Sequence, residues 1–256
     1  MNARPVALVT GAGRGIGRAC ALALVGRGFD VIINERSAEE DTADTVAAVT
    51  AAGGRAAVAL GDVADLTAHE ALLDAASAAF GRLDCLVNNA GVSVLARGDL
   101  LDVTPASFDR CLAVNTRGTF FLTQAFARRL LALPQPPWHR AIVFITSANV
   151  EVISISRGEY CVAKAAAAMV ARLFAVRLAA AGIGVYEVRP GIIRTRMTEP
   201  SQQHYERFFA AGGAPLGRWG EPSEVGACVA ALAAGALPYT VGQAVLVDGG
   251  LALKCL

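Results

Sequence analysis

Short apolar runs alternate with longer, alanine-rich amphipathic stretches along the whole chain of 256 residues. Runs such as Ala141-Ile142-Val143-Phe144-Ile145 are apolar at every position, which is typical of strands covered on both faces of a sheet. Helical stretches lie between the runs, and this order favours a parallel sheet with helices on both sides. Seven strands are predicted, at residues 6–10, 30–34, 56–61, 84–88, 141–146, 185–189 and 244–247.

No internal repeat, linker or change of composition divides the chain. It is therefore predicted to form one α/β domain over residues 1–256, with a doubly wound parallel sheet. One irregular segment, at about residues 196–220, interrupts the alternation and is rich in Gln, Glu, Gly and Pro. Because this segment is polar and follows a strand end, we expect it to form a lid over a site there.

Composition and charge exclude several classes of protein. The chain is 54% hydrophobic and 18% charged, with a net charge of +1 and no basic cluster, so neither disorder nor a nucleic-acid surface is expected. The apolar stretch around residues 165–176 contains Arg172 and is too short to span a bilayer. The first strand follows so soon after Met1 that no signal peptide is expected.

Cysteine and histidine residues are scattered along the chain. The six cysteines include no Cys-x-x-Cys pair, and the three histidines are far apart. This distribution predicts neither a disulfide framework nor a metal site, and it fits a reducing cytoplasm. The residues concerned are Cys20, Cys85, Cys111, Cys161, Cys228, Cys255, His69, His139 and His204.

A glycine-rich turn follows the first predicted strand and opens a helix. It reads Thr10-Gly11-Ala12-Gly13-Arg14-Gly15-Ile16-Gly17, and its glycine spacing differs from the common G-x-G-x-x-G fingerprint. Glycines allow a tight turn, and backbone N–H groups at a helix N-terminus can approach a pyrophosphate. The placement between strand and helix therefore predicts a dinucleotide site rather than an ordinary loop. Its residues are Gly11, Arg14, Gly15, Ile16 and Gly17.

The second predicted strand ends at Glu35-Arg36, where such folds contact the adenosine ribose. Glu35 can bind ribose hydroxyls and favours NAD(H), whereas Arg36 and Arg14 can hold a 2′-phosphate and favour NADP(H). Two cations against one anion slightly favour NADP(H), with NAD(H) as the alternative. Either Glu35 or Arg36 can instead be a solvated turn residue.

Asp62 and Val63 follow the third predicted strand. Asp62 can accept a hydrogen bond from the adenine amino group, which makes this pair a candidate cofactor contact. An N-cap for the following helix is an equally good interpretation of Asp62.

The most specific local signal is the pair Tyr160 and Lys164. The chain has only two lysines and four tyrosines, so this spacing is expected by chance roughly 0.03 times. Residues i and i+4 share a helix face, so the ammonium is expected beside the phenol oxygen, where it would lower the pKa of Tyr160. Such a tyrosine can exchange a proton with an alcohol oxygen. The alternative is a buried ring beside a solvated lysine.

Motifs along nearly the whole chain resemble, in order, those of the short-chain dehydrogenase/reductase family, in its branch of about 250 residues. They are Thr10-Gly11-x3-Gly15-Ile16-Gly17, Asn88-Asn89-Ala90-Gly91, Asn115, Ser147, Tyr160-x3-Lys164 and Pro190-Gly191. The resemblance implies a Rossmann-like fold and an NAD(P)(H)-dependent oxidoreductase that interconverts a ketone and a secondary alcohol. Three further motifs look most like 3-oxoacyl-[acyl-carrier-protein] reductases: Arg14-Gly15-Ile16-Gly17, Pro215-Leu216-Gly217-Arg218 and Val247-Asp248-Gly249-Gly250.

The resemblance also implies roles for individual residues. Ser147 would hydrogen-bond the substrate oxygen, and Tyr160 would be the general acid and base. Lys164 would hold the cofactor ribose and lower the tyrosine pKa. Asn115, on a predicted helix, would interrupt the helical hydrogen bonds and position a water that relays protons to Lys164. The further cofactor residues implied are Asn89, Ala90 and Gly91 on the adenosine side, and Pro190, Gly191, Ile193 and Thr195 around the nicotinamide.

The segment between Ser147 and Tyr160 departs from the plainer one expected of a fatty-acyl reductase. Glu151 and Arg157 can grip a polar or charged substrate, or form a salt bridge on the surface. A sugar or polyol dehydrogenase is therefore an alternative function. A catalytically silent nucleotide sensor is an alternative of another class, but it would be expected to lack Tyr160 or Lys164.

The long helix expected over residues 158–181 carries alanine on more than one face, so a partner helix can approach it closely. We therefore expect a homo-oligomer, a tetramer or a dimer. The other expected partner is a small carbonyl or alcohol substrate, with no nucleic acid and no membrane.

Overall fold

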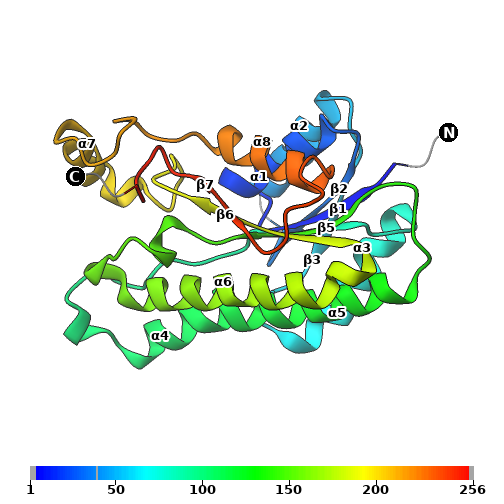
Figure 1. The fold of residues 1–256 in the computed structure, drawn as a ribbon, viewed down its shortest axis with the longest axis horizontal. Coiled ribbons are helices and arrows are strands. Elements are labelled where there is room, and N and C mark those ends of the chain that lie inside the picture. Colours follow the sequence, from blue (N-terminus) through cyan, green and yellow to red (C-terminus); the bar gives the residue numbers. More distant parts are fainter. Residues whose placement is uncertain (1–3, 39, 254–256) are drawn as a thin grey trace.

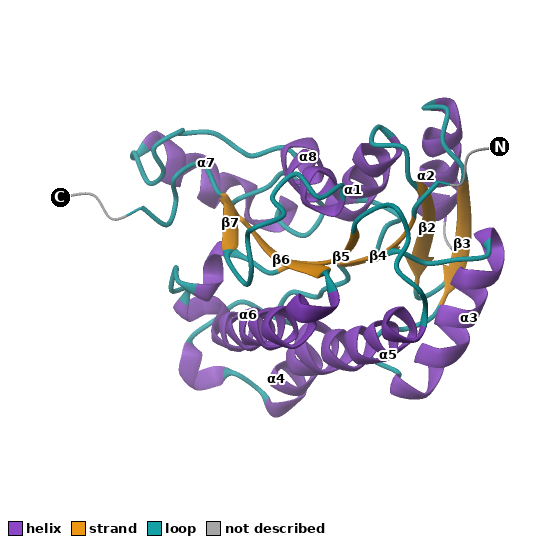
Figure 2. Ribbon diagram, turned by 45° about the vertical axis from the view of Figure 1, so that its right-hand side comes forward, coloured by secondary structure: helices purple, strands orange, loops and turns teal. Residues whose placement is uncertain are grey.

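Seven parallel strands form one sheet at the centre of the molecule (Figures 1 and 2). The computed structural model describes residues 4–38 and 40–253. The strands are β1 (Val6–Thr10), β2 (Asp30–Glu35), β3 (Ala56–Leu60), β4 (Cys85–Asn88), β5 (Arg140–Ile145), β6 (Ile183–Pro190) and β7 (Ala244–Val247). They lie in the order β3-β2-β1-β4-β5-β6-β7, which confirms the predicted doubly wound fold.

Helices cover both faces of the sheet (Figure 2). One layer contains α1 (Gly15–Val25), α2 (Glu40–Ala51) and α8 (Pro222–Ala233). The opposite layer contains α3 (His69–Phe80), α4 (Pro105–Leu112), α5 (Thr119–Ala132) and α6 (Gly158–Leu178). Successive residues of a strand point to opposite faces, so Leu8 and Val9 of β1 belong to two different cores.

Burial explains why the central strands are apolar throughout. Every residue of β1, β4 and β5 is buried, whereas the edge strands β3 and β7 are partly exposed. The order of strands reverses between β1 and β4, which pair directly in the middle of the sheet. A crevice forms at the carboxyl ends of strands at such a point, and this is where ligands bind in open α/β sheets.

The segment expected to be irregular, 196–220, contains a helix that the sequence did not indicate. Glu199–Ser201 forms a 3-10 turn and Gln202–Ala210 forms α7, which Figure 1 shows at the end of the molecule away from α3. Its buried residue, Tyr205, packs edge-on against Trp219 with 5.5 Å between the ring centroids. Phe209 of the same helix also packs edge-on against Trp219, so contacts with Trp219 order a helix whose other positions are largely polar.

The five cysteines within the described residues are all free thiols. Across residues 4–38 and 40–253, none of the helices combines the length and the apolar character that crossing a bilayer demands.

Candidate active site

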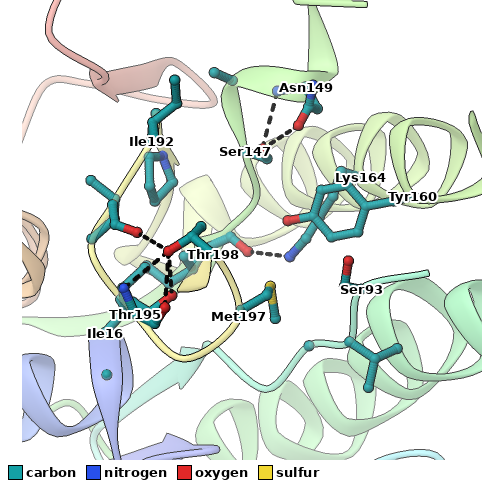
Figure 3. A pocket seen from close by; sticks show the side chains of 18 of the residues that line it. Ile16, Ser93, Ser147, Asn149, Tyr160, Lys164, Ile192, Thr195, Met197 and Thr198 are labelled. Carbon is teal, nitrogen blue, oxygen red and sulfur yellow. Dashed lines mark hydrogen bonds between the residues drawn. The ribbon is translucent and has the colours of Figure 1, made fainter. Parts of the chain in front are cut away.

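A cavity of about 920 Å³ lies at the carboxyl ends of the strands. Its walls come from the β1–α1 turn, the segments after β4, β5 and β6, the first turns of α6, and the segment that leads into α7. Figure 3 shows side chains from these elements converging on one space. The cavity therefore lies where the order of strands reverses.

The glycine-rich turn fits tightly against the end of β1. Gly11 and Gly15 have φ angles of +61° and +54°, which L side chains rarely adopt. A Cβ on Gly17 would lie 2.2 Å from the carbonyl oxygen of Gly11, so no larger residue fits there. The side-chain amide of Asn89 donates to the carbonyl oxygens of Thr10 (2.8 Å) and Gly11 (2.9 Å), which ties this turn to the end of β4.

The first turn of α1 lies in the wall of the cavity through Gly15, Ile16 and Gly17. Backbone N–H groups at a helix N-terminus attract phosphate, and the absence of side chains on the two glycines lets a ligand approach the backbone. These residues fit the pyrophosphate of a dinucleotide. Asn89, Ala90 and Gly91 line the same end of the cavity, as expected.

Glu35, at the end of β2, lines the cavity and accepts a hydrogen bond from the backbone N–H of Gly13 at 2.7 Å. Arg14 also lines the cavity, where it donates to Asp41 at 2.7 Å. Asp41 in turn accepts two hydrogen bonds from Arg196, at 2.8 and 3.2 Å. Arg36 is exposed and does not belong to the described residues that line the cavity.

Asp62 and Val63 likewise lie outside the described cavity lining. The carboxylate of Asp62 accepts from the backbone N–H of Ala64 at 2.8 Å, which closes a local turn. Val63 is buried, and its carbonyl oxygen accepts from His69 Nε2 at 2.8 Å. The structure therefore gives both residues local contacts and does not bring them to the cavity.

Tyr160, Lys164 and Ser147 meet in the cavity wall (Figure 3). Tyr160 and Lys164 project from the same side of α6, and Ser147 follows β5. The ammonium nitrogen of Lys164 lies 5.8 Å from the centroid of the Tyr160 ring, and it donates to the carbonyl oxygen of Ile145 at 2.9 Å. The Ser147 hydroxyl accepts from the backbone N–H of Asn149 at 3.1 Å.

The pKa of Tyr160 is shifted in the direction opposite to the one the sequence predicts. Burial raises it, because a phenolate is poorly solvated there, whereas the nearby Arg157 guanidinium and a hydrogen bond with Ser147 act to lower it. Burial also lowers the pKa of Lys164, to about 8. For Tyr160, desolvation thus outweighs the attraction between phenolate and ammonium that the spacing of Tyr160 and Lys164 suggested.

Asn115 lies in a π-helical turn, Ala113–Gly118, between α4 and α5. Its side chain accepts from the backbone N–H of Val92 and donates to the carbonyl oxygen of Val92, each at 3.0 Å. A Cβ on Gly91 would lie 2.8 Å from Asn115 Oδ1 and 3.5 Å from Lys164 Nζ. The expected interruption of the helix is therefore present, and it lies beside Lys164.

The residues expected around the nicotinamide all line the cavity: Pro190, Gly191, Ile193 and Thr195. A Cβ on Gly191 would lie 2.6 Å from the Cα of Asp248, so glycine is required for the chain to turn there. The backbone N–H of Thr195 donates to the Thr198 hydroxyl at 3.1 Å, which shapes the start of the segment that leads to α7.

Glu151 and Arg157 do not pair with each other. Glu151 pairs with the buried Arg189 of β6 and is absent from the described cavity lining. Arg157 lines the cavity, and its guanidinium carbon lies 5.4 Å from the centroid of the Tyr160 ring. Of the two, only Arg157 is placed to meet a substrate.

Several cavity residues carry no signal in sequence spacing. Asp41 lies 155 positions from Arg196, and Arg97 lies 108 positions from its hydrogen-bond partner Tyr205. Only the topology brings such residues together. The cavity residues outside every segment that the sequence predicted for the site include Asp41, Ser93, Arg97 and Arg110. Arg196, Met197, His204 and Tyr205 lie in the segment expected to form a lid, although the sequence did not single them out.

Comparison with known proteins agrees with this geometry. A family model described as enoyl-(acyl carrier protein) reductase matches residues 11–252. The chain belongs to the short-chain dehydrogenase/reductase family. It is 44% identical to a crystal structure of 3-oxoacyl-[acyl-carrier protein] reductase from Brucella melitensis in complex with NAD, with a TM-score of 0.96 and full coverage of both chains.

Curated relatives extend the similarity to other substrates. L-rhamnose 1-dehydrogenase (NAD(P)(+)) from Azotobacter vinelandii is 35% identical over 248 residues, which cover 95% of each chain. 3-Oxoacyl-[acyl-carrier-protein] reductase from Synechocystis sp. is 34% identical over 252 residues, which cover 97% of each chain. The predicted family is confirmed, and with it an oxidoreductase that uses NAD(P).

Proposed function

We propose that this protein interconverts a ketone and a secondary alcohol, with Tyr160 as the general acid and base. The observation that carries the proposal is the convergence of Tyr160, Ser147 and Lys164 in one cavity, whose other end is the glycine-rich turn. The cofactor, when bound, supplies or accepts the hydride. The protein positions the substrate and the cofactor and supplies a proton.

In the reducing direction, the Ser147 hydroxyl donates to the substrate carbonyl oxygen and holds it beside the phenol. Tyr160 donates its proton to that oxygen as negative charge develops on it. Burial, which raises the pKa of Tyr160, keeps the phenol protonated and ready for this step. In the oxidising direction Tyr160 must first lose its proton, and Lys164 favours that loss as long as it carries its positive charge.

We assign Lys164 and Asn115 roles in cofactor binding and proton transfer, with no direct contact with the substrate. We assign to Lys164 the ribose hydroxyls of the cofactor, because it lines the cavity with its ammonium near both the Tyr160 ring and Gly91. Asn115 clamps Val92 and lies beside Lys164, so we assign it the proton relay through a water at the π-helical turn. The π-turn supports this because it leaves the regular helical hydrogen bonds unmade.

We assign segment 196–220 the role of a lid. Met197, Thr198, His204 and Tyr205, all in this segment or its helix α7, line the cavity. The ion pair between Arg196 and Asp41 links the start of the segment to the first turn of α2. A ligand that fills the cavity would therefore contact the lid directly.

For the cofactor, the side-chain positions support NAD(H) over NADP(H), the reverse of the slight preference indicated by the sequence. Glu35 presents a carboxylate at the ribose end of the cavity and would repel a 2′-phosphate. Arg36 lies outside the described lining, and Arg14 already forms an ion pair with Asp41. Arg14 and Arg36 are thus poorly placed to bind a 2′-phosphate, whereas Glu35 is well placed to repel it.

The relatives favour two substrate classes. The Brucella melitensis and Synechocystis proteins are 3-oxoacyl-[acyl-carrier-protein] reductases, and similarity to them supports a ketone, including a 3-oxoacyl group. The Azotobacter vinelandii protein acts on L-rhamnose, and similarity to it supports a sugar or polyol dehydrogenase as the second candidate.

We also propose a homo-oligomer, a tetramer or a dimer, that uses the outer face of α6. Val162, Met169, Leu173 and Val176 share that face and are all about half exposed or more. Light scattering should give a multiple of 26.4 kDa, and Val176→Glu should shift the mass toward the monomer. The free thiols of the described cysteines suit the reducing cytoplasm, where we place the enzyme.

The function is tested by absorbance assays of a panel of ketones, alcohols and aldoses with both cofactors. Tyr160→Phe should bind the cofactor normally and lose ~10²–10⁴-fold in kcat, because acid–base assistance acts only in the transition state. Tyr239→Phe is the matched control, since Tyr239 is fully exposed. A Tyr160→Phe enzyme with near wild-type turnover would overturn the proposal in favour of a silent nucleotide sensor.

A further inference from the structure

The reacting end of the cavity is lined by three arginines that come from separate parts of the chain. Arg97 lies before η2 (Leu100–Asp102), Arg110 lies in α4, and Arg157 lies in η5 (Ile155–Arg157). We propose that the substrate carries a carboxylate a few bonds from its reacting carbon, and that Arg157, assisted by Arg97, binds that carboxylate. This inference rests on the proposed function, because it places the carboxylate relative to a carbonyl held at Tyr160.

The charges around the cavity are segregated. The acidic side chains that line it, Glu35 and Asp41, lie at the ribose end, where they bind Gly13 N–H and two arginines. Two other carboxylates that are close in sequence to the reacting end are turned away from it. Glu151 pairs with Arg189, and Glu159 is buried where it accepts from the Ser107 hydroxyl at 2.6 Å. Positive charge at the reacting end is therefore not balanced by an acid in the described wall.

The three guanidinium groups bind only neutral partners within the described residues. Arg157 donates to the Asn149 side-chain oxygen at 2.8 Å, and Arg110 donates to the carbonyl oxygen of Ser93 at 2.9 Å. Arg97 makes a long contact of 3.4 Å with the Tyr205 hydroxyl. A guanidinium has five N–H donors, so each arginine keeps most of them available.

Arg157 is the best placed of the three. Its contact with Asn149 fixes the guanidinium while the group lies 5.4 Å from the centroid of the Tyr160 ring. Arg97 lies over the ring of Tyr205, 5.9 Å from its centroid, and both residues line the same cavity as Arg157. A planar fork matches a carboxylate through two parallel hydrogen bonds, which a neutral ester cannot accept with the same strength.

A cleft lined by one sign of charge also concentrates a ligand of opposite charge and speeds its arrival. Recognition of a carboxylate here would therefore act on kcat/KM both through binding and through the rate of association. The second contribution falls with ionic strength, since salt screens exposed charges beyond ~10 Å at 0.1 M. Salt dependence then separates a charged substrate from a neutral one of equal shape.

The experiment compares each of two keto acids with its methyl ester, acetoacetate with methyl acetoacetate and levulinate with methyl levulinate. The wild-type enzyme should prefer at least one acid over its ester by ~10-fold or more in kcat/KM, and added NaCl should reduce that preference. Arg157→Gln should lower the acid-to-ester ratio by ~10–100-fold, mainly through KM of the acid, and Arg97→Gln by less. Arg27→Gln, at an exposed position in the turn after α1, is the control variant.

The ratio is the decisive quantity because Arg157 also lowers the pKa of Tyr160, an effect that acts on acid and ester alike. Equal use of acids and esters by the wild-type enzyme, or equal losses for both in Arg157→Gln, would overturn the carboxylate site while leaving the reductase intact. Reduction of neither acids nor esters, nor of any carbonyl in the wider panel, would instead count against the proposed function. If Arg157→Gln does not fold, the wild-type ratio, its salt dependence and Arg97→Gln decide the inference.

Discussion

The ammonium of Lys164 donates a hydrogen bond to the backbone carbonyl oxygen of Ile145 at 2.9 Å, across from α6 to the end of β5. Lys164 is buried, and this carbonyl lies two residues before Ser147. Because burial desolvates the ammonium, the pKa of Lys164 is lowered to about 8. The lysine therefore changes charge close to physiological pH.

A direct titration of Lys164 is practical because the chain has only two lysines. With [6-¹³C]lysine, the NMR spectrum should contain two lysine signals, one of which is absent in Lys164→Ala and has a midpoint at about pH 8 in the wild-type protein. The folded pKa lies below the unfolded value of 10.5, so the charged form opposes folding. This cost is fully present below pH 8 and is relieved as pH rises toward 10.5. A midpoint near 10.5 would contradict the burial of the ammonium.

The pH dependence of catalysis should reflect a phenol that stays protonated at neutral pH. Burial raises the pKa of Tyr160, so kcat/KM for ketone reduction should be constant across pH ~6–8. Alcohol oxidation needs the phenolate, so its kcat/KM should still rise with pH beyond that range. A reduction rate that falls with a midpoint near pH 7 would instead support the lowered pKa that the spacing of Tyr160 and Lys164 suggested.

Cofactor preference should depend on Glu35 and not on Arg36. Glu35→Ala should raise KM for NADH by ~10-fold or more, because a hydrogen bond to a charged group contributes about 1.5–3 kcal/mol, and it should lower KM for NADPH by removing repulsion. Arg36→Ala is the matched neighbour and should change neither value, since its side chain lies outside the described cavity lining. A rise in KM for NADPH alone in Arg36→Ala would restore the preference for NADP(H) indicated by the sequence.

The fold was predictable in detail because its signals are local. β1 and β7 match their expected bounds, and the other strands differ by one or two residues at one or both ends. Runs of apolar residues and strand-to-helix turns specify such elements without tertiary information. The helix α7 escaped prediction because its order depends on Tyr205 packing against Trp219, a contact between residues of a polar segment.

The candidate site was predictable where a motif fixes the spacing and less so where charges compete. Tyr160 and Lys164 lie on one face of α6 as their spacing requires. The sign of the Tyr160 pKa shift was wrong, because sequence shows a neighbouring charge but not the depth of burial. The partner of Arg14 could not be predicted from the sequence either, since Asp41 becomes its neighbour only when α2 packs beside the glycine-rich turn.

Removing Glu187, the buried partner of Arg189, should cost far more stability than removing Glu151, its exposed partner. Glu187 is buried in β6 and accepts from Arg189 Nε at 2.7 Å and from the Thr146 hydroxyl at 2.6 Å. Glu187→Gln would leave the buried guanidinium without its main counter-charge, which typically costs ~3–5 kcal/mol.

Glu151 is 58% exposed, so Glu151→Gln should cost no more than ~1 kcal/mol. Urea unfolding of both variants at equal pH gives the two free energies of unfolding, and the m value checks that each variant still unfolds in one transition. Glu151→Gln should also keep its activity, because Glu151 contacts Arg189 and not the described cavity wall. Equal losses of stability in the two variants would mean that Glu187 is not the main counter-charge of Arg189.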